Sequence, residues 1–294
     1  ARLREYNITV SPGKTFMNFH EVEVLGQKIT SFGLVPTKHR IEALQSLKFP
    51  QTLKDLESYI GIIGYLRRFI PHFSSLIKPL QDRKTRLLKS SPAKGGPQRQ
   101  EYTKKTSIAD PTEEELKSFD SIQSLWDKGL SLHHFRREDP LFIATDASKE
   151  MGIGAIMFHV DPEYAFSVKN DFTKMPPADA IQPVMYLSRC ITAAERNYWI
   201  TELEVTGIVW TLKSVHMYIS ASQRCIIYTD HAAAPQTIYR DPNNTPAGGH
   251  AAKVAADALY IRSFRQIEVY HIPGTQNIVP DALSRLQRLP LTCK

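Results

Sequence analysis

The sequence of 294 residues has few cysteines and none in a paired spacing. Its three cysteines, Cys190, Cys225 and Cys293, form no Cys-x-x-Cys pair. An odd number of widely spaced cysteines indicates neither a disulfide framework nor a zinc site, so we expect a protein of a reducing compartment. Long apolar runs are also missing. None approaches the roughly 18 residues that a membrane span needs, and the first residues lack the apolar core of a secretory signal, so we expect no membrane partner.

Acidic residues are too few to balance the basic ones in the first half of the chain. Residues 1–140 carry 23 basic and 16 acidic side chains, a net charge of +7, whereas residues 141–294 carry 14 of each. Residues 61–105 alone hold 11 basic and 2 acidic side chains. Such a stretch attracts a polyanion because binding releases condensed counterions. A solvated linker without a partner would have the same charge, so charge alone leaves both interpretations open.

The first part of the chain predicts a hairpin followed by short helices. Residues 1–33 alternate apolar and polar positions, and residues 22–29 around Gly26 are typical of a short hairpin. Short helices with short connections then predict a compact helical subdomain over residues 37–87. From helical spacing and capping patterns we expect three helices: one opening at Thr37, one after the pair Thr52 and Asp55, and one from Ser74 to Leu80, closed by Pro79.

The middle of the chain predicts a linker and a connecting helix over residues 88–139. Residues 88–111 are polar, basic and rich in proline and glycine, which is typical of a linker. Thr112 and Glu115 then form a capping-box pattern in front of an amphipathic stripe. We expect this helix to lead into a second domain.

From residue 140 onward, strands and helices are mixed. Three early strands followed by alternating helices and strands predict a mixed sheet with helices on its faces. The fold class is therefore α/β and α+β, a hairpin and small helical subdomain followed by a five-stranded mixed sheet flanked by helices. The expected strands cover residues 141–146, 152–160, 183–188, 225–230 and 268–272, and the expected helices cover residues 201–219, 250–264 and 279–286.

Four acidic residues lie at the ends of these elements. Asp146 and Asp230 end strands, Glu204 lies one turn into the long helix, and Asp281 opens the last helix. Taken singly, each would be interpreted as a helix cap or a surface charge. Together they would repel one another unless cations neutralised them, and hard divalent cations such as Mg²⁺ take oxygen ligands. Two such ions can hold a phosphodiester for attack by water, so the group predicts a two-metal phosphodiesterase site.

The sequence around these acids resembles a known family. This chain resembles the ribonuclease H domain of gypsy-type LTR retrotransposon reverse transcriptases, and above all that of the fungal members. The segments that carry the resemblance are TDAS, GIGAIM, ELEVTGIVW, IIYTDH and HIPGTQNIVPDALSRL. The segment that follows the polymerase palm in the same polyproteins resembles VEVLGQKITSFGLVPTKHRIEAL and LKDLESYIGIIGYLRRFIPHFSSLIKPL. The resemblance covers nearly the whole chain, with the segments in family order.

The resemblance implies a ribonuclease H-like domain over residues 140–294 that hydrolyses the RNA strand of an RNA–DNA hybrid. It matches Glu204 rather than Glu202, and the two side chains lie about 200° apart around a helix, so both cannot face one site. His271 matches a mobile histidine that assists catalysis, or it is a structural histidine, because it falls in an expected strand. The implied ligands of two Mg²⁺ ions, or of Mn²⁺ in their place, are Asp146, Glu204, Asp230 and Asp281.

The resemblance also implies contacts with nucleic acid. Residues 1–36 would be a primer-grip-like hairpin and palm remnant, and residues 37–87 a thumb-like subdomain that grips duplex backbone. The basic residues of the thumb-like subdomain could instead only solvate a helix end, and Ser148 could instead close a turn. The residues so assigned are Leu25, Gly26 and Gln27 in the hairpin, Arg67, Arg68 and Lys78 in the helices, and Ser148 beside the acids.

The sequence lacks the Tyr-x-Asp-Asp signature of a polymerase active site, so we do not expect this chain alone to synthesise DNA. The expected partners are an RNA–DNA hybrid or another nucleic-acid duplex, with no small-molecule substrate. One alternative is a catalytically silent, domesticated remnant that binds nucleic acid or a protein. Another is a structural subunit that pairs with a full-length reverse transcriptase chain. The location, a cytoplasmic virus-like particle or the nucleus, is left open.

Overall fold

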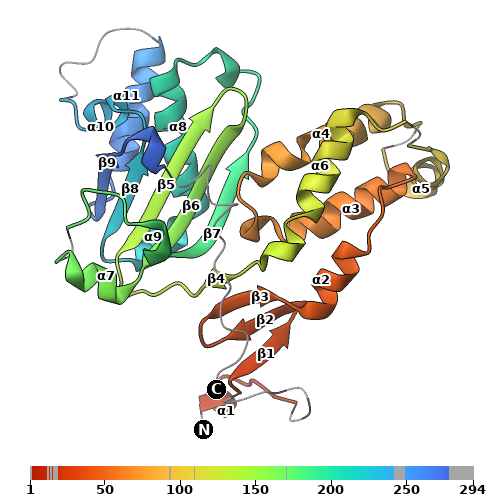
Figure 1. Cartoon of the computed structure of the whole chain (residues 1–294), viewed down its shortest axis with the longest axis horizontal. Coiled ribbons are helices and arrows are strands. Elements are labelled where there is room, and N and C mark those ends of the chain that lie inside the picture. Colours follow the sequence, from red (N-terminus) through yellow and green to blue (C-terminus); the bar gives the residue numbers. More distant parts are fainter. Residues whose placement is uncertain are drawn as a thin grey trace.

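The computed structural model describes residues 2–277 except positions 12, 14, 16–18, 93, 109, 170 and 242–248. These residues form a small four-stranded sheet, a group of helices and a five-stranded sheet with helices against it (Figure 1). The predicted fold class, α/β and α+β with a five-stranded mixed sheet, is confirmed. None of the helices in these residues is both long and apolar enough to cross a membrane.

The small sheet begins with the predicted hairpin. Its turn residues Leu25 and Gly26 have positive φ angles of 51° and 75°, the left-handed backbone that a two-residue hairpin turn requires. The sheet has the order β1-β2-β3-β4, and its last strand comes from much later in the chain. Its strands are antiparallel: β1 (Glu21–Val24), β2 (Gln27–Thr30), β3 (Gly33–Pro36) and β4 (Leu132–His133).

The helical subdomain contains the expected helices, but one of them is longer than predicted. Its third expected helix, α4, continues past Pro79, which was predicted to close it. Proline removes one backbone hydrogen bond from a helix, but α4 buries Ile77 and Leu80 on one face and packs against the helices on either side of it. The helices of this region are α2 (Lys38–Gln45), α3 (Leu53–Tyr65), the 3₁₀ turn η2 (Arg67–Phe69), α4 (Phe73–Lys89) and α6 (Glu113–Gln123). A short helix, α1 (Arg2–Glu5), precedes the small sheet and lies apart from them (Figure 1).

The segment predicted as a linker contains a helix, α5 (Gly96–Lys105), which its composition did not indicate. The Arg99 guanidinium forms an ion pair with Glu57 of α3. The Tyr102 hydroxyl donates a hydrogen bond to the Leu87 carbonyl at 3.0 Å. These contacts are made with residues far away in the sequence, so local composition does not reveal them.

The five-stranded sheet has the order β7-β6-β5-β8-β9. Strand β5 pairs antiparallel with β6 and parallel with β8; β7 then pairs antiparallel with β6, and β9 pairs parallel with β8. The expected helix over residues 201–219 is interrupted at Val215, and the expected helix over residues 279–286 lies outside the described residues. The strands are β5 (Leu141–Ser148), β6 (Gly152–Val160), β7 (Ile181–Arg189), β8 (Cys225–Thr229) and β9 (Ile267–His271).

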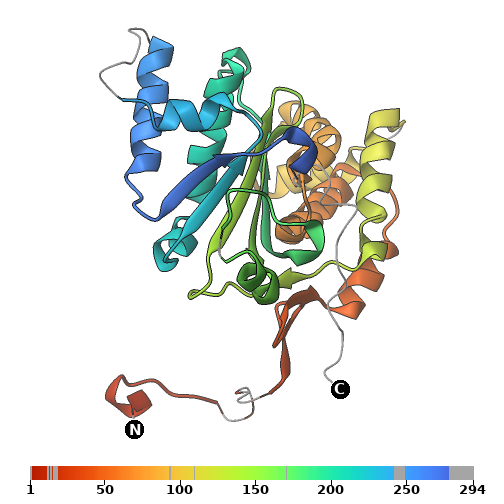
Figure 2. The same ribbon diagram turned by 60° about the vertical axis from the view of Figure 1, so that its left-hand side comes forward.

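Helices cover one face of this sheet, and the helical subdomain lies on its other side (Figure 2). The first face packs apolar side chains of α8 and of α11 against the strands, in a cluster that includes Ile143, Val209 and Ile261. The helices of this domain are α7 (Pro162–Ser167), α8 (Ile200–Ser214), α9 (His216–Ala221), α10 (Ala233–Ile238) and α11 (Gly249–Arg262). Neither α7 nor α10 was predicted from the sequence.

One apolar cluster extends from the helical subdomain into the other face of the sheet. It joins Phe69 of η2 to Tyr186 of β7 and to Phe142 of β5. At the same junction the Ser74 backbone N–H donates to the Ser188 hydroxyl at 2.9 Å, and the Ser74 hydroxyl donates to the Ser188 carbonyl at 2.8 Å. The helical subdomain and the sheet therefore share one core.

Candidate metal centre

Two neighbouring parallel strands place two of the predicted acids side by side. Asp146 lies near the end of β5, and Asp230 directly follows β8. The residues before them, Thr145 and Thr229, are register partners. Parallel strands end at the same edge of a sheet, so both carboxylates lie at this edge.

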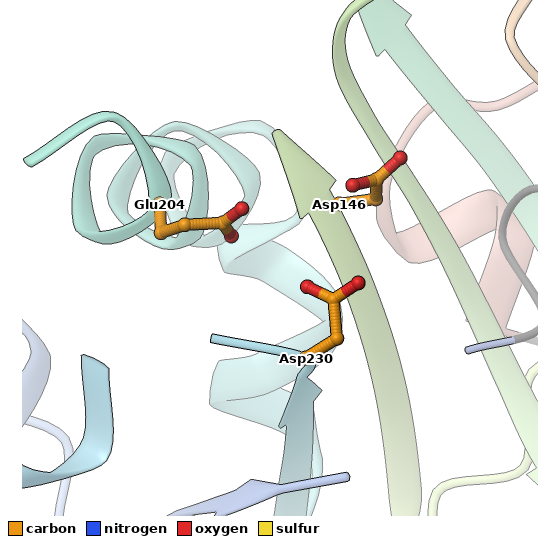
Figure 3. A group of neighbouring side chains, drawn as sticks. All are labelled: Asp146, Glu204 and Asp230. Carbon is orange, nitrogen blue, oxygen red and sulfur yellow. The ribbon is translucent and has the colours of Figure 1, made fainter. Parts of the chain in front are cut away.

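The third acid comes from the helix that covers this part of the sheet. Glu204 lies in α8 and is only 3% exposed. One turn later, Gly207 faces the sheet: a Cβ atom there would make ordinary van der Waals contact, at 3.4 Å, with side-chain atoms of Ala147 and Ile153, so α8 lies directly against β5 and β6. Asp146, Glu204 and Asp230 each offer a carboxylate oxygen, and these oxygens lie within 4.8 Å of one another (Figure 3).

Crowding changes the charge of this group. Burial, with the negative charges of Asp230 and Asp146, raises the pKa of Glu204 to about 8. Burial and the charge of Asp230 also raise the pKa of Asp146, although His72 and a backbone hydrogen bond from Ala147 act in the opposite direction. Negative charge at this edge is therefore incompletely compensated by the described protein groups around it.

A divalent cation would supply the missing positive charge. All the donors are carboxylate oxygens, which hard ions such as Mg²⁺ and Mn²⁺ accept, whereas Zn²⁺ sites usually include nitrogen or sulfur. The residues present therefore fit a hard divalent ion. The predicted fourth ligand, Asp281, lies outside the described residues.

The chain after β9 closes over the edge of the sheet next to these acids. In the turn η7 (Gly274–Gln276), a Cβ atom on Gly274 would lie 3.6 Å from Asp230 Oδ2. The next residue, Asn277, is only 5% exposed, and its Nδ2 atom donates to the Thr145 carbonyl at 3.2 Å. Asn277 thus ties this segment to β5 one residue before Asp146. Sequence analysis missed Asn277, whose only signal was its place in the HIPGTQN motif.

The helical subdomain also reaches this centre. Across the sheet, Asp146 pairs with Gly154, which pairs with Ser188, the residue that binds Ser74. Cross-strand partners present their side chains on the same face, and Gly154, between the other two, has no side chain. His72 precedes α4 at this junction and is only 8% exposed, and its electrostatic interaction with Asp146 lowers the pKa of that carboxyl. Nothing in the sequence around His72 indicated a link to acids so far along the chain.

Other residues singled out from the sequence lie around the centre in different settings. His271 is the exposed last residue of β9 and the register partner of Thr229. The Ser148 hydroxyl accepts a hydrogen bond from the Met151 N–H at 2.9 Å and so closes the turn after β5. Glu202 is buried but does not belong to the group of three acids.

The predicted nucleic-acid contacts lie in two other parts of the chain. Arg67 is exposed and Arg68 is half-buried, and both lie in η2, at the junction with the sheet. Lys78 is half-buried in α4. The hairpin residues Leu25, Gly26 and Gln27 form the turn between β1 and β2 and the first position of β2.

A comparison with protein families identifies the second domain. Residues 136–255 match the family model described as "RNase H-like domain found in reverse transcriptase". This part of the chain is therefore similar to the RNase H-like domains of reverse transcriptases. The matched residues include β5, β6, β7, α8 and β8, and with them Asp146, Glu204 and Asp230.

Two curated relatives extend this similarity to most of the chain. The chain is 27% identical to the "Retrovirus-related Pol polyprotein from transposon opus" of Drosophila melanogaster over 289 residues, 97% of this chain and 25% of that polyprotein. It is also 27% identical to the "Transposon Tf2-3 polyprotein" of Schizosaccharomyces pombe over 286 residues, 97% of this chain and 18% of that polyprotein. The predicted relationship to the Pol polyproteins of LTR retrotransposons is confirmed, and the chain spans a quarter or less of the length of these two relatives.

Solved structures show the same fold. A foamy viral protease-reverse transcriptase in complex with double-stranded DNA superposes with a TM-score of 0.62 at 21% identity, covering 92% of this chain and 41% of that one. The foamy viral protease-reverse transcriptase in complex with an RNA/DNA hybrid superposes with a TM-score of 0.61 at 19% identity, covering 96% of this chain and 32% of that one. The agreement includes the helical region as well as the RNase H-like domain, because it covers nearly the whole chain.

Proposed function

We propose that this chain hydrolyses the RNA strand of RNA–DNA hybrids and uses two divalent cations, Mg²⁺ or Mn²⁺, to do so. The observation that carries the proposal is the group of three carboxylates, Asp146, Glu204 and Asp230, whose oxygens lie within 4.8 Å of one another. The match to a reverse-transcriptase RNase H-like domain supports the same reaction. Asp281 would be the fourth ligand.

Each residue has a distinct part in this proposal. The bound ions would activate water and stabilise the leaving oxygen. Asp146 and Asp230 hold their carboxylates on adjacent strand ends, and Glu204 holds a third from a rigid helix. His271 is exposed at the end of β9, beside the strand that leads to Asp230, where its imidazole would assist proton transfer or product release.

The proposed substrate is held by its shape and its phosphates. The basic side chains Arg67, Arg68 and Lys78 and the hairpin turn would contact the duplex backbone, which carries no sequence information. The structural relatives bound to double-stranded DNA and to an RNA/DNA hybrid support a duplex partner of this kind. The first half of the chain has a net positive charge, which attracts the negatively charged phosphates of such a partner.

Cleavage of a hybrid with a labelled RNA strand tests this function. We expect the unchanged chain to cleave the RNA strand with Mg²⁺ and to leave duplex DNA intact. Asp230→Asn should slow cleavage by about a hundredfold or more, because it removes one charge from the metal centre, while hybrid binding without metal persists. Asp110→Asn, which removes the same charge from an exposed turn, serves as the matched control.

The same assay separates the alternatives. Salt-sensitive binding without cleavage in either metal would contradict the proposal and favour a silent nucleic-acid-binding remnant. Cleavage that appears only after a full-length reverse transcriptase chain is added would favour a structural subunit. An equal loss of cleavage in Asp230→Asn and Asp110→Asn would show that the effect is not specific to the metal centre.

A further inference from the structure

The hairpin turn at Leu25 and Gly26 is held from behind by two residues of the helical subdomain. The Tyr65 hydroxyl, at the end of α3, donates a hydrogen bond to the Leu25 carbonyl at 2.8 Å. Arg40 of α2 donates from Nη1 to the same carbonyl at 3.4 Å. The Arg40 guanidinium also lies 4.3 Å from the centre of the Tyr65 ring, so the two side chains fix each other.

The second residue of the turn is held by the same helices. The Gly26 carbonyl accepts a hydrogen bond from the Thr37 N–H at 3.2 Å. A Cβ atom on Gly26 would lie 2.4 Å from Arg40 Nη1 and would displace the end of that side chain, and the φ angle of 75° at this position also favours glycine. Contacts from both α2 and α3 therefore make the position of the turn depend on the helical subdomain as well as on its own strands.

The side chain at the tip of this turn points outward. Leu25 is 79% exposed, although its backbone has a positive φ angle that favours glycine or asparagine. Its backbone carbonyl is anchored while its apolar side chain makes little contact with the rest of the protein. Packing within the described chain thus explains the fixed backbone but not the exposed leucine.

We propose that Arg40 and Tyr65 are positioning residues that hold this turn so that Leu25 packs against the sugars of a nucleic-acid duplex. The inference rests on the proposed function, because it takes duplex binding by this chain as given. The occupant follows from charge and continuity: Arg40 lies directly behind the turn, Arg67 is exposed two residues after Tyr65, and the whole positive excess lies in this half of the chain.

Binding of a fluorescently labelled RNA–DNA hybrid, measured by anisotropy without divalent metal, tests the proposal. Tyr65→Phe keeps the ring and removes only the hydroxyl donor, and it should weaken binding by about threefold to tenfold. Arg40→Lys keeps the positive charge but removes the planar guanidinium that lies over the Tyr65 ring, and it should weaken binding similarly. Tyr102→Phe is the matched control, since it removes the same type of bond, to the Leu87 carbonyl, and should leave affinity unchanged.

A double-mutant cycle distinguishes positioning from a general loss of structure. Leu25→Ala should weaken binding by itself, and adding Tyr65→Phe should weaken it little further, because both changes act on one contact. Additive losses, or an unchanged affinity in Tyr65→Phe, would overturn the positioning role while hybrid cleavage by the unchanged chain could still support the proposed function. Failure of the unchanged chain to bind any duplex would overturn both.

Discussion

Glu204 shows how its surroundings decide the charge of a single side chain. The carboxylate is almost fully buried beside two other acids, and burial comes first among the causes that raise its pKa to about 8. A carboxyl with an ordinary pKa near 4.5 in the unfolded chain ionises much earlier than this one. Protonation of Glu204 is therefore coupled both to folding and to cation binding.

This coupling predicts how stability depends on pH when no divalent cation is present. Between pH 4.5 and 8 the unfolded chain loses a proton that native Glu204 keeps, so the free energy of unfolding should fall by roughly 3–5 kcal/mol as pH rises. Saturating Mg²⁺ should remove most of this fall, because the ion stabilises the ionised carboxylates. Urea unfolding at several pH values, with and without Mg²⁺, measures it. Without Mg²⁺, the free energy of unfolding of Glu204→Gln should fall less steeply with rising pH than that of the unchanged protein. An equally steep fall would contradict the prediction.

His159 predicts the opposite pH dependence. It is fully buried, with Nδ1 donating to the Pro140 carbonyl and Nε2 accepting from the Arg136 N–H, both at 2.9 Å. Burial, the largest cause, lowers its pKa from 6.5 to about 4. The unfolded chain takes up a proton first as pH falls through 6.5, so stability should decrease toward pH 4 by roughly 2–3 kcal/mol.

The measurement for His159 is urea unfolding in Mg²⁺ between pH 7 and 4. His159→Gln should show a shallower loss of stability with falling pH, whatever its stability at pH 7. His216→Gln, a change at an exposed histidine, should keep the slope of the unchanged protein. Equal slopes in the two variants would show that His159 does not cause the acid sensitivity.

At the scale of elements, local patterns were good predictors where a short segment decides its own structure. The capping boxes at Thr52 and Thr112 begin α3 and α6, as their spacing indicated. Short apolar segments identified the strands of the larger sheet, and carboxylates at strand ends correctly indicated that Asp146 and Asp230 would lie together. Helix α5 was missed because its contacts come from distant residues. The same holds for His72 and Asn277, whose partners lie on other elements.

One prediction at this scale concerns the tie between the segment after β9 and β5. Asn277→Ala removes a buried hydrogen bond to the Thr145 carbonyl and should lower the free energy of unfolding by about 1–3 kcal/mol. It should also weaken Mg²⁺ binding in calorimetric titration, because that segment lies against Asp230 and leads toward Asp281. Gln276→Ala, at the exposed neighbouring position, should change neither quantity. An unchanged Mg²⁺ affinity in Asn277→Ala would leave the residue a purely structural role.

A second prediction concerns the proline within α4. Pro79 cannot donate to the carbonyl one turn earlier, that of Ser75, and its ring crowds that turn. Pro79→Ala should restore this hydrogen bond and raise the free energy of unfolding by about 1–2 kcal/mol, part of the gain being offset by a more flexible unfolded chain. Thermal and urea unfolding would measure the change. A loss of stability would mean that the ring itself contributes to packing.

At the scale of the whole molecule, the helical subdomain and the sheet share one apolar cluster. Proteins with one continuous core usually unfold in a single step, whereas independent domains unfold separately. We therefore expect one calorimetric transition for this chain, with equal calorimetric and van't Hoff enthalpies. Ser188→Ala, which removes the hydroxyl that accepts from Ser74, should lower the transition temperature without dividing it. Two separate transitions would contradict the shared core.

The shared core also limits how this chain could exchange parts with related proteins by recombination. A junction placed between β4 and β5 would join a helical subdomain from one parent to a sheet from another. Phe69 and its neighbours would then face a β7 with which they had not been selected, and poorly filled space between them would cost about 1 kcal/mol for each missing methyl group. The two parts are therefore expected to be inherited together, as one unit of exchange.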